Sequence, residues 1–209
     1  MPTNPHLSGR TRAGCRFAPA SKMVRLFVAL SVLGLSCDEM LVAADAPGVS
    51  EEQVKAAFLI SFPKYVDWPS NAFAEADSPI VVAVYGESGL DKDLQEMIKD
   101  KVIMGHPLVF KRVTAEGEGA GGYHILFIDA TVARRIPDIL EKLDGASVLT
   151  VGDSDDFLDS GGVIRLVKRD RKIRIEVNLT AAKRAHLKLS SKLLGVADVV
   201  LGGPHSRGG

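Results

Sequence analysis

The sequence predicts an α/β fold, namely a three-layer α/β/α sandwich with a mixed, partly parallel sheet ending in an antiparallel hairpin. Three observations predict it. Apolar runs typical of buried strands alternate with helical patterns as far as residue 151, which favours parallel βαβ units. Residues 163–168 and 173–177 then flank a polar turn, as the two arms of a hairpin do. Neither a repeat nor a linker interrupts the pattern, so we expect one domain over residues 48–201.

Residues 1–44 are expected to precede this domain as an over-extended start followed by a secretory signal peptide. Residues 1–22 are rich in Arg, Pro, Ser and Gly and have no apolar period. From Met23, a short positive segment leads into the apolar run Leu26–Leu35, which is typical of a secretory signal, and we place cleavage near Ala44. An uncleaved anchor is the alternative, although this run is shorter than the roughly 20 residues that a bilayer span needs.

Cysteine usage and charge constrain the mature domain. Cys15 and Cys37 both precede the expected cleavage site, so the mature domain would use no disulfide. Cys37 also raises the alternative of a lipoprotein, but Gly34 stands where the signal for lipid attachment usually has an aliphatic residue. Removal of residues 1–44 leaves 21 basic and 24 acidic residues, a formal charge of −3. We therefore expect no nucleic-acid partner.

An amphipathic helix is predicted to begin the domain. Ser50 and Gln53 have the spacing of a capping box. Pro63 is expected to kink the helix or end it early, and Trp68-Pro69 closes the segment. One helical stripe is apolar and is expected to be buried; its members are Val54, Ala57, Phe58, Phe62, Tyr65 and Val66.

The remaining elements follow from local patterns. Nearly continuous apolar runs predict buried strands at residues 80–85, 108–113, 123–128 and 147–151. Helices are predicted at residues 90–98, 132–143 and 179–200, the second with Pro137 as a weak point. Asp153 is expected to cap a helical turn around Phe157. In the second hairpin arm, Arg174 and Glu176 alternate with apolar residues, which predicts a half-exposed strand. Residues 116–122 form a Gly-rich loop, and residues 202–209 a disordered tail.

No motif has the spacing of a catalytic or metal site. Gly86–Gly89 lies between a strand and a helix, where nucleotide folds bind phosphate, but it lacks the further glycines and the Walker lysine, which favours a plain turn. Residues 152–156 lack the ligand positions of an EF-hand, and the histidines lack zinc-site spacing. No Ser-His-Asp set can be selected from sequence order. We therefore expect no cofactor, no metal and no enzyme activity.

Seven segments, spread over about residues 50–200, together carry a family resemblance. They are Val54–Leu59 with Trp68-Pro69, Ile80–Gly86, Tyr123–Ile128, Val148–Asp153, Gly161–Ile164, Ile175–Leu179 and Ser190–Leu194. In order and spacing these segments resemble the YfiR-like family of bacterial periplasmic proteins. The resemblance implies an exported regulatory protein. In the family's best-understood role, such a protein binds the sensor domain of an inner-membrane diguanylate cyclase and lowers cyclic di-GMP signalling.

The resemblance also implies partners and a location. We expect a membrane-bound diguanylate cyclase or another sensor protein as partner, a possible homodimer, and a periplasmic location. Pro63 departs from the better helix former usual in the family, and the cysteine pairs of some relatives are missing from the mature domain, so redox sensitivity is not carried over. The alternative is a periplasmic small-molecule-binding protein or hydrolase with a site at the strand carboxyl ends, near Gly86, Asp129 and Gly152.

Five residues are candidates for partner binding: Tyr65, Trp68, Arg169, Arg171 and Lys172. Tyr65 and Trp68 are large aromatic residues, which anchor interfaces as well as cores. The three basic residues belong to the predicted hairpin tip, residues 168–172. Such a tip suits an acidic partner surface or anionic headgroups, and a solvated turn is the alternative.

Overall fold

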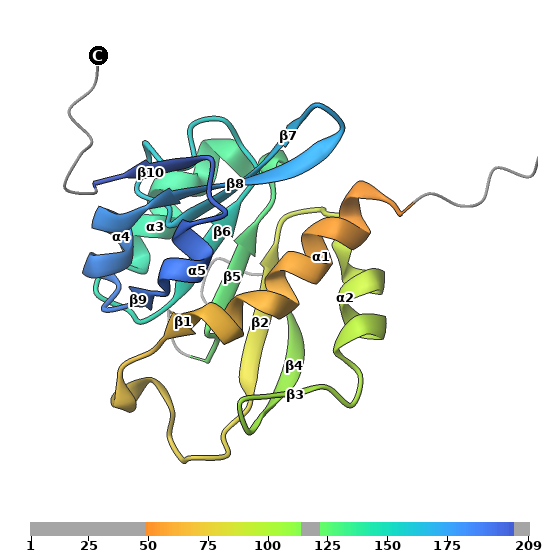
Figure 1. The fold of residues 1–209 in the computed structure, drawn as a ribbon, viewed down its shortest axis with the longest axis vertical. Coiled ribbons are helices and arrows are strands. Elements are labelled where there is room, and N and C mark those ends of the chain that lie inside the picture. The colour runs from red at the N-terminus through yellow and green to blue at the C-terminus, as the bar shows by residue number, and fades with distance from the viewer. Residues whose placement is uncertain (1–48, 114–121, 203–209) are drawn as a thin grey trace, which may run out of the picture. The chain divides into compact units, whose positions relative to one another are not determined.

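The computed structural model describes residues 49–113 and 122–202, which form a layered α/β domain (Figure 1). Eight strands form one mixed sheet; in spatial order they are β10 (Val199–Leu201), β8 (Lys172–Asn178), β7 (Ile164–Arg169), β6 (Leu149–Gly152), β5 (Ile125–Ile128), β2 (Ile80–Tyr85), β4 (His106–Val113) and β3 (Val102–Ile103). A separate pair joins β1 (Val66–Asp67) to β9 (Lys188–Leu189) in antiparallel pairing.

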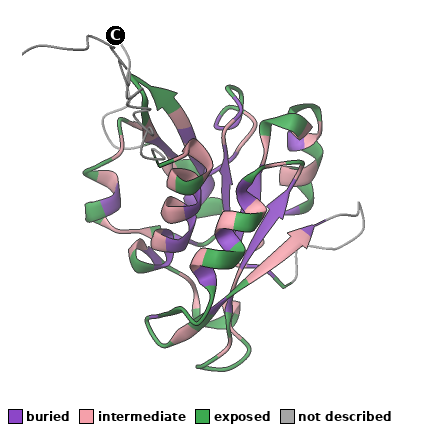
Figure 2. Cartoon of the chain, turned by 90° about the vertical axis from the view of Figure 1, so that its right-hand side faces the viewer, coloured by how far each residue is buried: buried purple, intermediate pink, exposed green. Residues whose placement is uncertain are grey.

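Helices cover both faces of the sheet, so the predicted three-layer sandwich is confirmed. One face packs against α1 (Glu51–Ser61), α2 (Leu90–Ile98), α4 (Leu179–Arg184) and α5 (Ser191–Leu194). The other face packs against α3 (Ile136–Lys142). Successive residues of β2 serve the two layers in turn, with Val82 and Val84 facing the first core and Ala83 and Tyr85 the second. Figure 2 shows buried residues concentrated in the strands and exposed residues on the outer sides of the helices.

Local signals set the bounds of α1 as predicted. The Ser50 side chain accepts a hydrogen bond from Gln53 N, and the Gln53 side chain accepts one from Ser50 N, so the capping box is confirmed. The α-helix ends at Ser61, and a 3₁₀ turn, η1 (Phe62–Tyr65), carries Pro63. Pro63 therefore ends the helix early, since its ring and missing N–H do not allow another α-helical turn.

The face of α1 that meets the sheet differs from the predicted stripe. Ala56, Leu59 and Ile60 are buried, whereas Val54, Ala57 and Phe58 are only partly buried. The prediction of a buried stripe was wrong for these three and for Tyr65, which is also only partly buried, and correct for Phe62 and Val66, which are buried. The helix is apolar on two neighbouring stripes, and periodicity alone does not decide which of them packs on the sheet.

The central elements follow the prediction, with one correction. β2, α2, β4, β5 and β6 lie where strands and helices were expected. The helix expected over residues 132–143 begins as a 3₁₀ segment, η3 (Ala130–Arg135), and becomes α3 only at Ile136. Pro137 therefore lies in the first turn of α3, where a missing N–H costs nothing, and is not a weak point inside the helix.

The C-terminal region is the largest difference from the sequence prediction. Residues 179–200 do not form one helix but α4, β9, α5 and β10 in succession. Asn178 caps α4 and Ser190 caps α5, while His186 takes a positive φ of 56° between them. β10 then pairs in parallel with β8, with Val200 opposite Val177, so the hairpin is not the end of the sheet.

The β7–β8 hairpin itself is confirmed. Asp170 and Arg171 both have positive φ, 50° and 60°, as a tight two-residue hairpin turn requires. The second arm is less exposed than predicted, because Glu176 is 3% exposed.

Several expectations fall outside the described residues. They are the N-terminal segment with cleavage near Ala44, the loop at residues 116–121 and the tail at residues 203–209. Within residues 49–113 and 122–202, no helix has the length and apolar character needed to cross a bilayer.

Candidate partner-binding groove

An apolar groove of about 930 Å³ is lined by α1 together with residues of α2, β8 and α5. The partly buried residues Val54, Ala57 and Phe58 of α1 line it, so the stripe predicted to be buried forms a wall of this groove instead. Val196, which is 65% exposed, and Met97 of α2 belong to the same lining. The remaining lining residues are Val49, Gln53, Ser61, Phe62, Tyr65, Asp93, Glu96, Ile175, Lys192 and Leu193. We call this surface the α1 groove.

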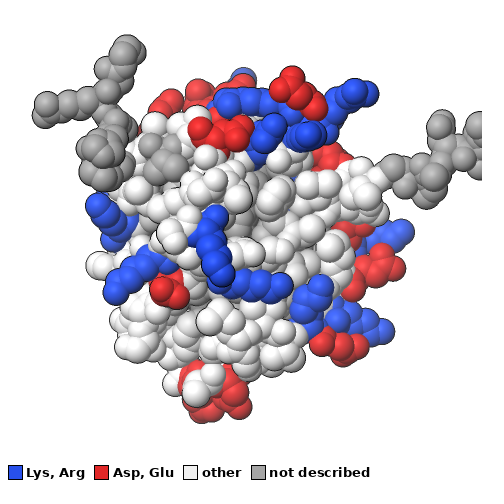
Figure 3. Space-filling model, viewed as in Figure 1, with Lys and Arg blue, Asp and Glu red and all other residues white. Residues whose placement is uncertain are grey.

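The α1 groove continues toward the hairpin tip. A second hollow of about 510 Å³ shares Val49, Val54 and Phe58 with it and is also lined by Arg171 and Lys172. Figure 3 looks onto the side of the domain that carries α1 and α5, where uncharged residues surround a few basic side chains. The groove is thus mainly apolar along α1 and basic at its end near the hairpin tip.

The structure brings three of the five predicted partner-binding residues to this surface. Tyr65 lines the groove, and Arg171 and Lys172 line the adjoining hollow. Arg171 and Lys172 are exposed, and neither forms an ion pair with another described residue. These two side chains are therefore available to an acidic partner.

Trp68 and Arg169 lie elsewhere. The Trp68 ring packs edge-on against Phe73 and His124, away from the groove lining. The Arg169 guanidinium turns back to the hairpin and donates to Glu176 Oε1 at 2.6 Å. Both residues are thus engaged within the domain.

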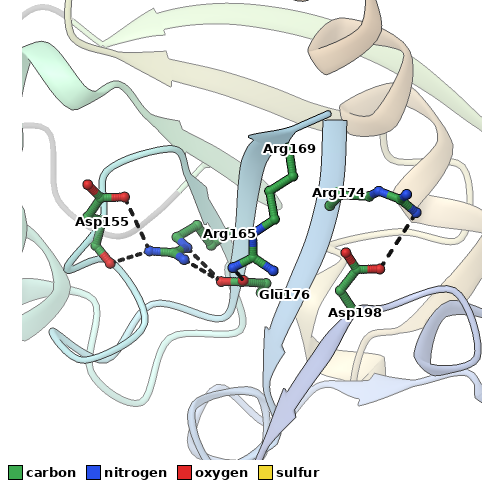
Figure 4. Close-up of polar contacts among 6 residues, drawn as sticks. All are labelled: Asp155, Arg165, Arg169, Arg174, Glu176 and Asp198. Carbon is green, nitrogen blue, oxygen red and sulfur yellow. Dashed lines mark hydrogen bonds and ion pairs between the residues drawn. The ribbon is translucent and has the colours of Figure 1, made fainter. Parts of the chain in front are cut away.

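The buried carboxylate of Glu176 is the centre of a charge cluster that the sequence analysis missed (Figure 4). Arg165 donates through Nε and Nη2 to Glu176 Oε2, each at 2.7 Å, and also contacts Asp155. Arg165 and Glu176 are directly opposite each other in the β7–β8 register. Counting residues outward from the hairpin turn pairs Arg165 with Glu176. The sequence therefore contained a signal for this ion pair.

A second charge network fixes α1 to the carboxyl ends of the parallel strands. Lys55 Nζ lies 2.7 Å from Asp153 Oδ2 and 2.8 Å from Glu51 Oε1. Asp153 Oδ1 accepts from Ala130 N at 2.8 Å, so Asp153 binds across the sheet edge and does not cap the turn around Phe157, as had been predicted. Burial disfavours the ammonium of Lys55, but the carboxylates of Asp153 and Glu51 outweigh it and raise the pKa of Lys55 above 10.5.

The positions named for a small-molecule site at the strand ends are packed together. Gly86 has a φ of +104°, and a Cβ there would lie 2.8 Å from Asp129 Cβ. Asp129 Oδ1 accepts from Thr131 N and thereby caps η3. A Cβ at Gly152 would overlap the ring of Phe157. Gly86, Asp129 and Gly152 are therefore closely packed against their neighbours, whereas the α1 groove is open.

Within residues 49–113 and 122–202, no group of three or more His, Cys, Asp or Glu side chains is placed to hold a metal ion. The chemistry that the surface offers there is apolar contact along α1 and ion pairing at the hairpin tip.

Comparisons with known proteins place the chain in a family. Two solved structures resemble it with TM-scores of 0.47: an ABC domain in complex with L-Trp from Streptococcus pneumonia (11% identity) and a conserved domain protein from Vibrio cholerae O1 biovar eltor (13%). Each comparison covers 72% of this chain and 60% of the other, and at these scores it carries no functional argument. No curated protein matches the chain. The model of YfiR/HmsC-like proteins matches residues 52–198, and the chain therefore belongs to the YfiR/HmsC-like family.

Proposed function

We propose that this protein is an exported, non-enzymatic regulator that binds the periplasmic sensor domain of a membrane-bound diguanylate cyclase and lowers cyclic di-GMP signalling. Its family consists of periplasmic regulators, which supports this class of function. The α1 groove is the observation that carries the proposal, because a hollow with an apolar lining on a soluble domain is typical of a binding surface.

The dimensions of the α1 groove indicate the kind of segment that it accepts. α1 has 11 residues, and at 1.5 Å per residue it offers a wall of about 16 Å. An amphipathic helix of about three turns fits this length, with apolar side chains against Phe58 and Val196. Burying one such side chain contributes about 1.5–3 kcal/mol, so several anchors together offset the free-energy cost of association.

The charges around the α1 groove favour one orientation of that segment. Arg171 and Lys172 lie at the end where α1 begins, and Asp93 and Glu96 lie along the α2 wall. A partner segment with acidic residues near the hairpin tip and basic residues facing α2 would complement both charges. The proposed partner surface is therefore apolar along one stripe and acidic at one end.

The first test is the cellular level of cyclic di-GMP with and without the gene. We expect the level to rise on deletion and to return when the full chain is supplied from a plasmid. An unchanged level would reject the link to a cyclase. The same strains then serve to test the groove.

A pair of matched variants tests the groove itself. Val196→Asp places a charge in the lining, whereas Val109→Asp places one on β4, where the side chain is 42% exposed and does not line the α1 groove. We expect the Val196 variant to lose repression and pull-down of the sensor domain, and the Val109 variant to keep both. Thermal unfolding of the two purified chains controls for stability. Full repression by the Val196 variant would show that the partner docks elsewhere.

A further inference from the structure

Four aromatic side chains hold the segment between β1 and β2 against the sheet. Phe73 lies between the imidazoles of His106 and His124, with ring centroids 4.4 and 4.5 Å apart and interplanar angles of 22° and 18°. Trp68 meets the His124 ring edge-on at 6.2 Å. His106 begins β4 and His124 immediately precedes β5, so the cluster ties residues 68–78 to the amino ends of two strands. We call Trp68, Phe73, His106 and His124 the histidine clasp.

Hydrogen bonds to backbone atoms fix the protonation of His124. The Val81 N–H donates to His124 Nδ1 at 3.2 Å, so Nδ1 carries no proton. His124 Nε2 lies 3.1 Å from Ala72 O, which can only accept, so Nε2 carries the proton. The ring is thus neutral, with both nitrogens engaged by groups that cannot change their roles.

His106 holds the other end of the same segment. Its Nδ1 lies 2.8 Å from Ser78 O and donates to it. This bond is compatible with the neutral ring and with the cation, because a carbonyl accepts from either. The response of the clasp to acid therefore depends on His124.

We infer that the histidine clasp is released by acid. Protonation turns His124 Nδ1 from an acceptor into a donor that faces the Val81 N–H, so this hydrogen bond breaks. Residues 68–78 are then freed from the sheet. The new cation also faces His106 across the Phe73 ring. Stacking on Phe73 compensates part of the charge, but it does not replace the lost hydrogen bond.

Among residues 49–113 and 122–202, no acidic side chain is placed as a counter-charge to His124. Among the described residues, no carboxylate oxygen lies within 4.0 Å of a ring nitrogen of either histidine. Asp67, Glu75 and Asp77, the acidic residues of this stretch of chain, are exposed. His106 is the titratable group that acts on His124, and its charge opposes a second one.

The direction of the pH effect follows from the environment of His124. Burial lowers the pKa of His124 below its usual 6.5, the bond to Ala72 O opposes this, and His106 adds to the lowering. Once the segment is released, His124 regains its ordinary pKa and takes up a proton more readily than it does in the closed clasp. The closed clasp therefore keeps its full stability above pH 6.5 and loses it as pH falls from there through the lowered pKa.

Trp68 is the only tryptophan of the chain and reports directly on the clasp. We would follow its emission, and hydrogen exchange of residues 70–78, in the purified full chain between about pH 8 and pH 5. The expected result is a reversible emission change with a midpoint below 6.5. Protection factors of residues 70–78 should fall by up to about tenfold for each pH unit between 6.5 and the lowered pKa of His124 and level off below it, while those of β5 and β6 stay unchanged.

Two variants identify the responsible histidine. In His124→Gln, the side-chain oxygen can accept from Val81 N and the amide can donate to Ala72 O, but nothing titrates, so the transition should disappear. His186 is exposed with a φ of 56°, which asparagine tolerates, so His186→Asn should keep the transition.

Three results would overturn the inference: an unchanged emission in the wild type, an identical transition in His124→Gln, or exchange that rises equally throughout the sheet. If His124→Gln fails to fold, nitrogen-15 chemical shifts of the histidine rings in the wild type test the inference, because they report the tautomer and the titration midpoint of His124. We expect the Nε2-protonated tautomer for His124 and a midpoint below 6.5. The opposite tautomer or a higher midpoint would contradict the clasp.

Discussion

Lys55 is the residue through which α1 is held at the carboxyl ends of the strands. Its side chain is 12% exposed and joins Glu51 on its own helix to Asp153 after β6. Glu51 in turn lies 2.9 Å from Lys168 at the base of the hairpin tip. Since these residues come from three separate elements, the network sets the position of α1 and of the groove beside it. Two carboxylates around one ammonium also explain why a charge this far from solvent is tolerated.

Glu51 is expected to stabilise the fold at neutral pH and to lose this effect in acid. Hydrogen bonds from Lys55 and then Lys168 lower the pKa of Glu51 below 4.5. Its contribution is therefore present above pH 4.5 and is lost as pH falls through the lowered pKa. We expect Glu51→Gln to cost about 0.5–1 kcal/mol near pH 7 and almost nothing near pH 3, as measured by urea unfolding.

Glu52→Gln is the matched control for this prediction. The Glu52 carboxylate of the wild type forms no ion pair with the described residues, although Glu52 lies in the same first turn of α1 as Glu51. The control should therefore change stability little at either pH. An equal loss at both pH values for Glu51→Gln would contradict the ion-pair explanation.

At the scale of elements, the β7–β8 hairpin depends on the Arg165–Glu176 pair. Glu176 is 3% exposed, so removing its carboxylate leaves Arg165 with a charge that is largely shielded from water. We expect Glu176→Leu to cost about 2–4 kcal/mol, measured by denaturant unfolding, and Arg165→Leu/Glu176→Leu together to cost less than Glu176→Leu alone. A double variant that is no more stable than the single one would show that the pair contributes through packing and not through charge.

The turn between β6 and β7 is built around Phe157. This side chain is fully buried, and a Cβ at Gly152 or Gly162 would overlap its ring. We expect Gly162→Ala to destabilise the domain by about 1–3 kcal/mol, because the overlap forces the ring to move in a packed core. Thermal unfolding measures the effect. Gly162→Ala with Phe157→Leu should recover part of the loss, and no recovery would place the cause in the backbone.

At the scale of the whole molecule, the basic hairpin tip is expected to speed partner binding more than it strengthens it. Arg171 and Lys172 are exposed at the end of the α1 groove, where salt screens charges strongly. Replacing both by alanine should lower the association rate with the proposed sensor domain several-fold at low salt and little at high salt, as measured by surface plasmon resonance. A change confined to the dissociation rate would contradict electrostatic steering.

Much of the architecture was accessible from the sequence because it depends on neighbouring residues. The capping box of Ser50 and Gln53, the end of α1 at Pro63 and the continuous apolar run of β2 are local signals, and the structure agrees with all three. Of the site, the sequence indicated Tyr65, Arg171 and Lys172, since an aromatic side chain beside a helix end and a basic tip are visible locally.

The tertiary structure determined which surfaces are buried and which distant segments come into contact. Periodicity predicted one buried stripe on α1, but contact with the sheet buried the neighbouring stripe, so Val54 and Phe58 remain open as a groove wall. The pairing of β10 with β8, the burial of Glu176 and the histidine clasp likewise join segments far apart along the chain. The sequence by itself thus determined the order of elements and their caps, which local backbone energetics control. Which faces were covered was decided only by long-range packing, because the free energy of burial depends on what the rest of the chain brings to each surface.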